Sequence, residues 1–395
     1  MRINHWQQSR NCLFSLLVMA LAFYVTSTSA KNSEQVKQEL PLSELKAFSE
    51  AYFQIKSSYV DDVEDVDLIR AAISGMVSSL DVHSRYLSPD DLRQFNTDNV
   101  GEYEGVGLSF NDHKYGIEVV EVVSGGPADK AGIEPGMIVT HIDKEAIQYL
   151  PVSEALTKLK GPIDSTVILT VAAAKFAKPK DIALQREVIV IASVASQSLP
   201  NRTAYVGLSS FTMHSVEEFK NAITSLSEEN AIANLILDLR DNPGGVMDVA
   251  VELSDLFIPE GTLLISSGRT DDANEIFYAK QAAPFSDLKV VVVINKGSAS
   301  ASEILAAALK DHGKAVVLGE TSYGKGSIQT LIPLNYESGM KITTAEYYSP
   351  LGNRIQDVGI KPDIKFDQQK RVNSYNVSLL DDPQLLQAYN ILLKQ

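Results

Sequence analysis

The chain has 395 residues, of which 45% are hydrophobic and 22% are charged, and its formal net charge is −15. This length is too great for one compact core, so we expect two or three domains. The negative charge is not offset by any basic stripe, which excludes nucleic acid as an expected partner.

The N-terminus is typical of a secretory signal. Arg2 and Arg10 precede or flank the start of an apolar run from Cys12 to Val25, and small residues at Thr28-Ser29-Ala30 offer a cleavage site. We therefore predict an exported, periplasmic protein that loses residues 1–30. The alternative is an uncleaved leader that anchors the protein in the membrane, although the apolar run is short for a span. Cleavage would also remove the only cysteine, and with it any disulfide or cysteine metal site.

Hydrophobic periodicity divides the rest of the chain into three parts. Residues 31–95 carry apolar side chains at spacings of three and four, which predicts helices, and Ser88-Pro89-Asp90-Asp91 is a helix start. Residues 96–182 alternate short apolar runs with glycine and proline, which predicts a small β-rich module. The run from Phe176 to Lys180 indicates either its boundary or an exposed hairpin. In this module we expect strands at Val106–Phe110, Ile117–Val123, Met137–Ile142 and Thr166–Val171, and short helices at Ala128–Ala131 and Val152–Leu159.

Residues 183–395 alternate strands with helices, which predicts an α/β layer structure. The run Lys289–Ile294 is apolar on both faces, as expected for a strand buried within a sheet. The other expected strands are Ala204–Ser209, Ala233–Leu239, Ala315–Gly319, Ser327–Leu334 and Ile342–Tyr348, and the expected helices are Ser215–Glu228, Met247–Phe257, Ala301–Leu309 and Pro383–Leu393.

Ser300 stands at the start of an expected helix. The segment Ser300-Ala301-Ser302-Glu303 fits a capping box, with serine at the N-cap and glutamate at the third helical position. The same place suits a nucleophile, because the free N–H groups and the positive dipole end of a helix favour the oxyanion of acyl transfer. Ser298 and Ser302 compete for that role, and their spacing does not exclude them.

Lys325 lies between Gly324 and Gly326 and has three interpretations. The segment from Gly319 matches the start of a phosphate loop, but Gly326 replaces the magnesium-binding Ser or Thr, and a strand is expected next. A solvated turn lysine is the second interpretation. The third is a general base for a serine, with its pKa lowered from about 10.4 by burial between the glycines. The amide of Gln329 would then orient the amine, or Gln329 is an ordinary strand residue.

Two glycine-containing loops have a structural and a functional interpretation. Asp238 to Gly245 follows an apolar strand and is either a simple turn or an oxyanion-binding loop, since paired glycines allow close backbone approach. Gly105 to Phe110 lacks the last glycine of a dinucleotide loop, so it is either a strand start or a loop that holds a peptide carboxylate. The six histidines show no metal-binding spacing, and His312 is too near Ser300 to complete a triad, so we expect no metal and no cofactor.

Taken together, these motifs resemble the carboxyl-terminal processing peptidases, also called tail-specific proteases. The resemblance covers the chain from about residue 45 to its end, and it implies an N-terminal helical segment (31–95), an inserted PDZ domain (96–182) and a crotonase/ClpP-like α/β protease core (183–395). The segments that carry it are Leu80–Leu87, Gly105–Phe110, Gly126–Gly136, Asp238–Gly245, Ser298–Ile304, Gly324–Gly326 with Gln329, and Thr343–Asp363.

The resemblance implies a role for each motif residue. Ser300 would be the nucleophile, because the family places it 25 residues before the lysine, Lys325 the general base and Gln329 the residue that orients the lysine. The chain departs from the family at Lys160-Gly161, where an arginine is common, and at Val82, where proline is usual. The implied backbone sites are an oxyanion hole formed by Ala301 with Gly244 or Gly245, and a tail-binding loop formed by Gly105, Val106, Gly107 and Leu108.

We therefore expect an exported serine endopeptidase that cleaves protein or peptide substrates with exposed C-terminal tails, near those C-termini, through an acyl-enzyme. The PDZ domain would bind the tail and regulate access. A regulatory adaptor and a homo-oligomer paired through the helical ends, 31–95 and 383–393, are further expected partners. The alternative from another class is an exported PDZ adaptor on an inactive protease-like scaffold.

Overall fold

The computed structural model describes residues 40–173, 178–280, 283–335, 337–367 and 381–394. The expected signal sequence lies outside these residues. Within the described ranges, no helix is both long enough and apolar enough to cross a membrane. The chain divides into two units, Met1–Ala71 and Ala72–Gln395, and each is described by itself.

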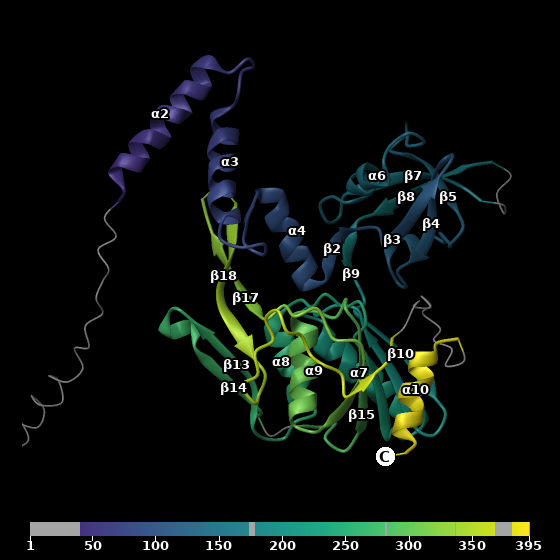
Figure 1. Cartoon of the computed structure of the whole chain (residues 1–395). Helices are drawn as coiled ribbons and strands as arrows, with labels where there is room; N and C mark the ends of the chain where they lie inside the picture. Colours follow the sequence, from purple (N-terminus) through teal and green to yellow (C-terminus); the bar gives the residue numbers. More distant parts are fainter. Residues whose placement is uncertain (1–39, 174–177, 281–282, 336, 368–380, 395) are drawn as a thin grey trace, which may run out of the picture. The chain divides into compact units, whose positions relative to one another are not determined.

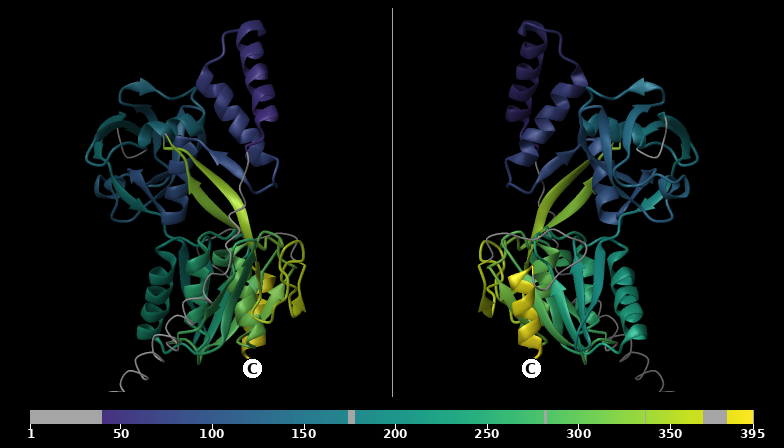
Figure 2. Two further views of the ribbon diagram at one scale, coloured as in Figure 1. Left: turned by 90° about the vertical axis from the view of Figure 1, so that its left-hand side faces the viewer. Right: turned by 90° about the vertical axis from the view of Figure 1, so that its right-hand side faces the viewer.

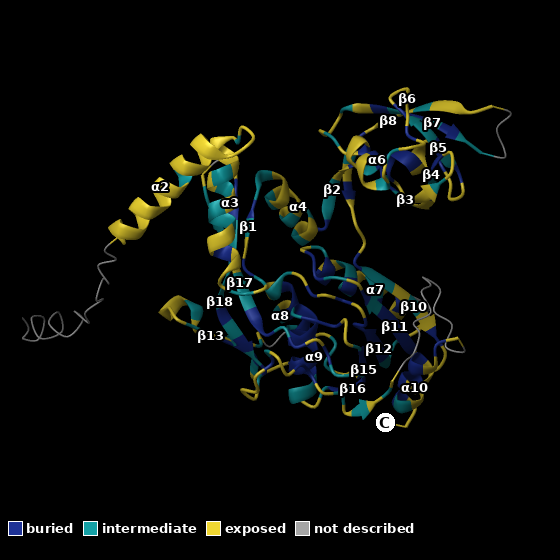
Figure 3. Cartoon of the chain, turned by 45° about the horizontal axis from the view of Figure 1, so that its top comes forward, coloured by how far each residue is buried: buried dark blue, intermediate teal, exposed yellow. Residues whose placement is uncertain are grey.

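The N-terminal part is helical, as the periodicity predicts. Helix α2 (Leu42–Ser58) has no buried residue, and Figure 3 shows it largely in the colour of exposed residues. Helix α3 (Asp65–Ser78) follows it. Helix α4 (Pro89–Val100) starts at the predicted place, because Ser88 and Asp91 form a reciprocal capping box that satisfies two free backbone N–H groups. The short strand β1 (Arg85–Leu87) was not predicted.

The β-rich module is one antiparallel sheet with strand order β3-β4-β5-β7-β8, and β6 pairs with β5. Strands β7 and β8 form a hairpin with Thr166 opposite Gln185, so Lys178 to Lys180 belong to a hairpin and not to a boundary. Phe176 and Ala177, where this predicted run begins, lie outside the described residues. The sheet therefore extends three residues past position 182. Its elements are β3 (Leu108–His113), β4 (Gly116–Val122), α5 (Pro127–Lys130), β5 (Ile138–Ile142), β6 (Glu145–Ala146), α6 (Val152–Leu159), β7 (Thr166–Ala172) and β8 (Lys180–Gln185).

The chain enters and leaves this module through a two-stranded ribbon. Strand β2 (Glu102–Gly105) precedes the module, and strand β9 (Glu187–Val190) follows it. The two strands pair antiparallel, with Tyr103 opposite Ile189. Neither strand was predicted, because each is short and is stabilised by a partner about 85 residues away in sequence.

The α/β part contains a six-stranded sheet with the order β10-β11-β12-β15-β16-β19, in which only β10 runs antiparallel. Strand β15 is buried from Val290 to Ile294, which confirms the prediction of a strand covered on both faces. The strands are β10 (Val194–Leu199), β11 (Thr203–Leu208), β12 (Asn234–Asp238), β15 (Lys289–Ile294), β16 (Ala315–Gly319) and β19 (Ile364–Lys365).

Helices cover both faces of this sheet, so the core has three layers. Leu235 and Leu237 of β12 belong to the hydrophobic cluster shared with α7 (Ser215–Glu229), α8 (Met247–Asp255) and α9 (Ala301–Asp311). Ile236, which points to the opposite face, belongs to the cluster shared with α10 (Pro383–Leu392). Figures 1 and 2 show α10, in yellow, beside the strands of this sheet.

A second sheet, in which all the strand pairings are antiparallel, has the order β1-β18-β13-β14, with β17 also paired to β18. Its centre is the ten-residue strand β18, which pairs with β17 along one edge and with β1 and then β13 along the other. This sheet places β17, which directly follows the Lys325 turn, beside β18. The elements are β13 (Thr262–Gly268), the 3-10 turn η1 (Asp271–Ala273), β14 (Glu275–Tyr278), β17 (Ser327–Pro333) and β18 (Gly339–Tyr348).

Candidate active site

Three loops that carry candidate residues leave the carboxyl ends of neighbouring parallel strands. Leu239–Gly245 follows β12, Asn295–Ser300 follows β15, and Glu320–Gly326 follows β16. The carboxyl ends of parallel strands lie at one edge of a sheet, where α/β proteins commonly form their sites. This topology brings together segments whose ends, Leu239 and Gly326, lie 87 residues apart in sequence.

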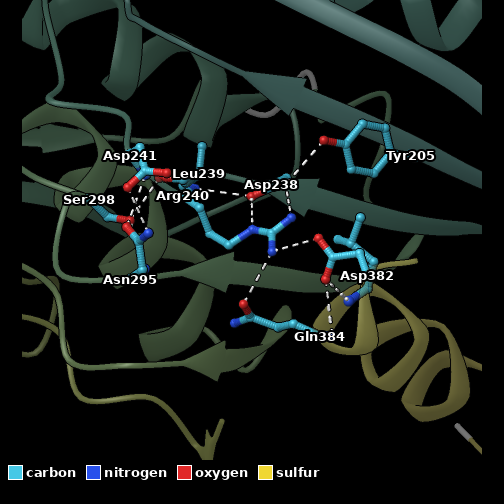
Figure 4. Close-up of polar contacts among 10 residues, drawn as sticks. Tyr205, Asp238, Leu239, Arg240, Asp241, Asn295, Ser298, Asp382 and Gln384 are labelled. Atoms are coloured by element: carbon cyan, nitrogen blue, oxygen red, sulfur yellow. Dashed lines mark hydrogen bonds and ion pairs between the residues drawn. The ribbon is translucent and has the colours of Figure 1, made fainter. Parts of the chain in front are cut away.

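Backbone and side-chain hydrogen bonds join the three loops. The Ser298 hydroxyl donates to the Leu239 carbonyl at 2.7 Å, and the Ala299 N–H donates to the Asn242 carbonyl at 3.0 Å. The side chains of Asp241 and Asn295 pair across the same interface at 2.8 Å, as Figure 4 shows. The loop of glycines is thus fixed against the serine turn.

Ser300 has the exposure and backbone geometry of a nucleophile, whereas its two competitors do not. Its φ of 57° and ψ of −117° are unusual for a residue with a side chain, and its side chain is only partly buried. Ser298 and Ser302 are fully buried, and each hydroxyl donates to a carbonyl of the neighbouring loop. The fold therefore leaves the middle serine as the one that a substrate can approach.

Glu303 joins the serine turn to the lysine turn. Its side chain is fully buried, and its Oε2 atom accepts the Ser300 N–H at 2.8 Å and the Lys325 N–H at 2.9 Å. Its Oε1 atom accepts the Gly324 N–H at 2.7 Å and the Ser322 hydroxyl at 2.5 Å. Four hydrogen-bond donors compensate the cost of burying this carboxylate. The capping-box pattern predicted the contact with Ser300 but not the contacts with the lysine turn.

Lys325 is half-buried, and this burial lowers the pKa of its amine, although the negative charge of Glu303 opposes the shift. The flanking glycines permit close packing, as the sequence predicts. A Cβ atom on Gly326 would lie 2.3 Å from the Gln356 nitrogen, and one on Gly324 would lie 3.0 Å from the Gly359 nitrogen. No larger residue fits at these two positions without moving the backbone.

Tyr347 of β18 lies beneath both turns. Its side chain is almost completely buried, and this burial raises the pKa of its hydroxyl strongly. The hydroxyl donates to the Lys325 carbonyl and lies within hydrogen-bonding range of the Ser300 side chain. Tyr347 is thus a further neighbour of the candidate pair that sequence reasoning missed.

In the ranges that the structure describes, no hydrogen bond joins Gln329 to Lys325. The Gln329 amide donates to the Ser327 hydroxyl at 2.8 Å and to the Thr343 hydroxyl at 3.5 Å. Among the hydrogen bonds of the described residues, none joins the Lys325 amine to the Ser300 hydroxyl. The structure therefore brings the two turns together through Glu303 and Tyr347, and the catalytic hydrogen bonds expected from the sequence are not formed.

The candidate oxyanion hole is built from backbone N–H groups around Ser300. A Cβ atom on Gly244 would lie 2.7 Å from the Ser300 Cβ, so glycine is required there. Its φ of 100° is also accessible to glycine alone. The Gly244 N–H already donates to Asn242 Oδ1 at 2.9 Å. For the N–H groups of Gly245 and Ala301, no acceptor is recorded within the described part of the chain.

The candidate tail-binding loop, Gly105 to Leu108, joins β2 to β3. Its carbonyl groups are used within the module: Val106 accepts the Ala128 N–H, and Gly107 accepts the Val123 N–H. The N–H groups of Leu108 and Gly107 are directed at the hydroxyl of Tyr103, whose pKa is raised by burial. The ring of Tyr103 lies against Gly105, where a Cβ atom would approach it to 2.6 Å.

His83 is another titratable group near the candidate pair. Burial and then the charge of Lys325 lower the pKa of its imidazole, which places it within electrostatic range of that amine. The backbone N–H of His83 donates to Asp81 Oδ1 at 2.7 Å. The sequence showed only its place before the β-rich module. In the described residues, no group of three or more His, Cys, Asp or Glu side chains is arranged to hold a metal ion.

Comparisons with known proteins agree with the motifs and the fold. Residues 202–366 match the model of peptidase family S41, residues 118–172 match a PDZ domain, and residues 16–90 match the N-terminal domain of the activating protease CtpB. The solved structure of a putative S41 protease from Bacteroides fragilis covers 85% of this chain and 91% of its own, with a TM-score of 0.52. At 16% identity, it supports the fold alone.

Two curated relatives match along most of their length. The carboxy-terminal-processing protease of Bartonella bacilliformis is 33% identical over 370 residues, which cover 92% of this chain and 83% of the relative. The carboxy-terminal processing protease CtpA of Bacillus subtilis is 31% identical over 352 residues, which cover 89% and 75%. These matches confirm the resemblance inferred from the motifs and favour the peptidase over the adaptor. The chain belongs to peptidase family S41 and is a carboxy-terminal processing serine protease with a PDZ domain.

Proposed function

We propose that the chain is an exported serine endopeptidase in which Ser300 is the nucleophile and Lys325 the general base. The observation that carries the proposal is the Glu303 carboxylate, whose single Oε2 atom accepts the backbone N–H of both residues. A buried charge with four donors is a rigid connection, so the two turns have a fixed separation while their side chains remain free to react. A buried glutamate at position 303 is accounted for by this connection between the serine turn and the lysine turn.

The proposed reaction proceeds in two steps. The neutral amine of Lys325 takes the proton of the Ser300 hydroxyl as its oxygen attacks the scissile carbonyl, and the resulting ammonium then protonates the leaving amine. Water attacks the acyl-enzyme in the second step, with the same amine as base, and releases the new carboxylate. Burial favours the neutral amine that this chemistry requires.

Backbone N–H groups would stabilise the oxyanion of each step. Ala301 and Gly245 are the preferred donors because their N–H groups are available, and Gly244 would have to release Asn242 to take part. Gln329 remains a prediction as the residue that orients Lys325. Its amide would have to turn away from Ser327 to reach the amine.

The substrates would be proteins or peptides with exposed C-terminal tails. A PDZ domain binds such a tail as an added strand, with its carboxylate on the backbone N–H groups of the loop from Gly105 to Leu108. The charged leader and apolar run of residues 1–30 support export to the periplasm, with a retained leader as the alternative. A regulatory adaptor and a homo-oligomer remain proposed partners.

Replacement of the candidate pair tests the proposal. Ser300→Ala and Lys325→Ala are each expected to abolish cleavage of an unstructured peptide with an apolar tail, followed by mass spectrometry, and to leave tail binding and folding intact. A serine-directed fluorophosphonate probe is expected to label the wild type at Ser300. Full cleavage by Ser300→Ala, or labelling at another serine, would contradict the assignment.

A further inference from the structure

A buried ionic cluster connects the C-terminal helix to the glycine loop of the candidate oxyanion hole. The Arg240 guanidinium donates to both carboxylate oxygens of Asp238, at 2.9 Å and 2.6 Å. It also pairs with Asp382 at 2.9 Å and donates to Gln384 at 3.3 Å. The side chains of Arg240 and Asp238 are 3% and 1% exposed, and that of Asp382 is 5% exposed. Figure 4 shows these contacts converging on the guanidinium.

The charges of this cluster are compensated locally. Two carboxylates face one guanidinium, and the excess negative charge lies at Asp382, which is the N-cap of α10. Its Oδ1 atom accepts the N–H groups of Gln384 and Leu385, at 3.0 Å and 3.2 Å. The positive end of the helix dipole therefore stabilises the second carboxylate. The Tyr205 hydroxyl donates to Asp238 at 3.1 Å.

Arg240 lies at the start of the loop that forms the oxyanion hole. Two residues later, the Asn242 carbonyl accepts the Ala299 N–H and the Ser302 hydroxyl, both at 3.0 Å. Gly244 then approaches Ser300 so closely that a Cβ atom would not fit. The loop is thus bound to the serine turn on one side and, through Arg240, to the C-terminal helix on the other.

Stability alone does not account for ions at this place. Apolar side chains of similar volume often stabilise a buried site as well as an ion pair does, whereas a polar cluster fixes direction. Helix α10 already has an apolar face that packs on the sheet, formed by Leu385, Ala388, Tyr389 and Leu392. The cluster adds a directional constraint on the loop to that packing.

We propose that Arg240 is a positioning residue for the oxyanion hole and that Asp382 and Gln384 hold it in place. The C-terminal helix would then be part of the catalytic apparatus, needed for acylation of the enzyme and not for binding of the substrate. This inference rests on the proposed function, since it takes Ser300 as the nucleophile.

The test compares two changes in the same helix. Asp382→Asn keeps the size and the N-cap acceptor but removes the charge that pairs with Arg240. Leu392→Ala removes buried apolar contacts at the far end of α10, where Leu392 is 2% exposed, and serves as the control for lost stability. The rate of fluorophosphonate labelling at Ser300, kcat and KM are measured for both variants, together with their unfolding midpoints in urea.

We expect Asp382→Asn to slow labelling and kcat at least tenfold with KM within twofold of the wild type. Leu392→Ala is expected to lower the unfolding midpoint about as much as Asp382→Asn does, and to change the labelling rate less than twofold. If Asp382→Asn does not fold, Gln384→Leu replaces it. This change keeps the side-chain volume and removes the weaker contact with Arg240, so we expect the same kind of effect with a smaller size.

Two results would overturn the inference while leaving the nucleophile assignment intact. One is labelling of the charge-removed variant at the wild-type rate, and the other is an equal loss of rate in Leu392→Ala. Labelling of the wild type at a residue other than Ser300 would instead remove the nucleophile assignment and this inference together.

Discussion

The backbone of Ser300 is held in a conformation that a residue with a side chain rarely adopts. Its φ of 57° is enforced from both sides, because the Ala299 N–H is bound by Asn242 and the Ser300 N–H by Glu303. Such conformations cost about 1–3 kcal/mol and persist only where the surroundings determine them. We expect the gain to be functional, since the turn leaves the Ser300 side chain only partly buried at the start of the otherwise buried helix α9.

This strain gives a prediction with a matched pair of variants. Ser300→Gly and Ser300→Ala both lack the hydroxyl, but only glycine tolerates the positive φ. We expect the glycine variant to have a free energy of unfolding higher by about 1 kcal/mol, from urea titrations of both proteins. Glycine is preferred to alanine even at an ordinary N-cap, so a difference well below 1 kcal/mol, or a more stable alanine variant, would show that the turn is not strained.

Replacement of Glu303 by glutamine should affect both turns. The glutamine amide places a donor against N–H groups, so hydrogen bonds to a charged acceptor are lost, and each such bond contributes about 1.5–3 kcal/mol. We expect kcat to fall at least about tenfold. Glu320→Gln, which breaks an ion pair with the exposed Lys296, is the control and is expected to leave kcat unchanged.

The same variant has a second, independent readout. The negative charge of Glu303 raises the pKa of Lys325, so its removal should lower that pKa further. If the neutral amine is the base, the ascending limb of kcat/KM against pH moves to lower pH in Glu303→Gln. A limb that moves to higher pH would contradict the role of Lys325.

Lys325 also predicts how stability depends on pH. Burial lowers its folded pKa below the unfolded value of 10.5, so between the two values the unfolded chain binds more protons and stability increases with pH. Lys325→Met should therefore raise the free energy of unfolding at pH 7, and this gain should shrink toward pH 10. Turnover should fall by about 10²- to 10⁴-fold. A gain that grows with pH would mean that the amine is charged in the folded enzyme.

At the scale of elements, the sequence predicted most of those that are long and strongly patterned, but it missed the six-residue strand β10 and the seven-residue strand β13. Strand β15 is an unbroken apolar run, and α4 has its capping box in the sequence, so both were predicted to within a few residues. The short strands β1, β14 and β19 were not predicted. Each has two to four residues and exists because a distant strand offers hydrogen bonds, such as Met340 of β18 to Tyr86 of β1.

The candidate site divides in the same way. Ser300 and Lys325 were found because glycine and serine motifs surround them in the sequence. The role of Glu303 depends on a contact 22 residues away, and that of Tyr347 on a contact 22 residues in the other direction from Lys325. Such contacts follow from the pairing of β17 with β18 and not from any local pattern.

The loop between β2 and β3 supports a prediction about tail binding. The Tyr103 hydroxyl lies near the N–H groups of Gly107 and Leu108, which we propose bind the carboxylate of a peptide tail. Tyr103→Phe removes this internal acceptor and should tighten the binding of a labelled tail peptide severalfold, measured by fluorescence anisotropy on the Ser300→Ala background. Tyr149→Phe, at a tyrosine of the same module that is 90% exposed, is the control. Unchanged or weaker binding by Tyr103→Phe would contradict this competition.

At the scale of the molecule, the proposed function would separate recognition of the substrate tail from the chemistry of cleavage. The tail-binding loop belongs to a module with its own sheet and core, whereas Ser300 and Lys325 lie at the edge of the α/β sheet. A contact that is equally strong before and in the transition state affects KM and leaves kcat unchanged. The tail carboxylate should act in this way.

Amidation of the substrate's C-terminus tests this separation. Two peptides with the same scissile sequence, one ending in a carboxylate and one in an amide, differ only in the charge that the Gly105–Leu108 loop would bind. We expect kcat/KM to fall about tenfold or more for the amide, through KM, with kcat at saturation within twofold, because a hydrogen-bonded charge contributes about 1.5–3 kcal/mol. A loss confined to kcat would mean that the tail carboxylate acts on the cleavage step. Tail binding by the β-rich module and cleavage by the α/β part would then not be independent.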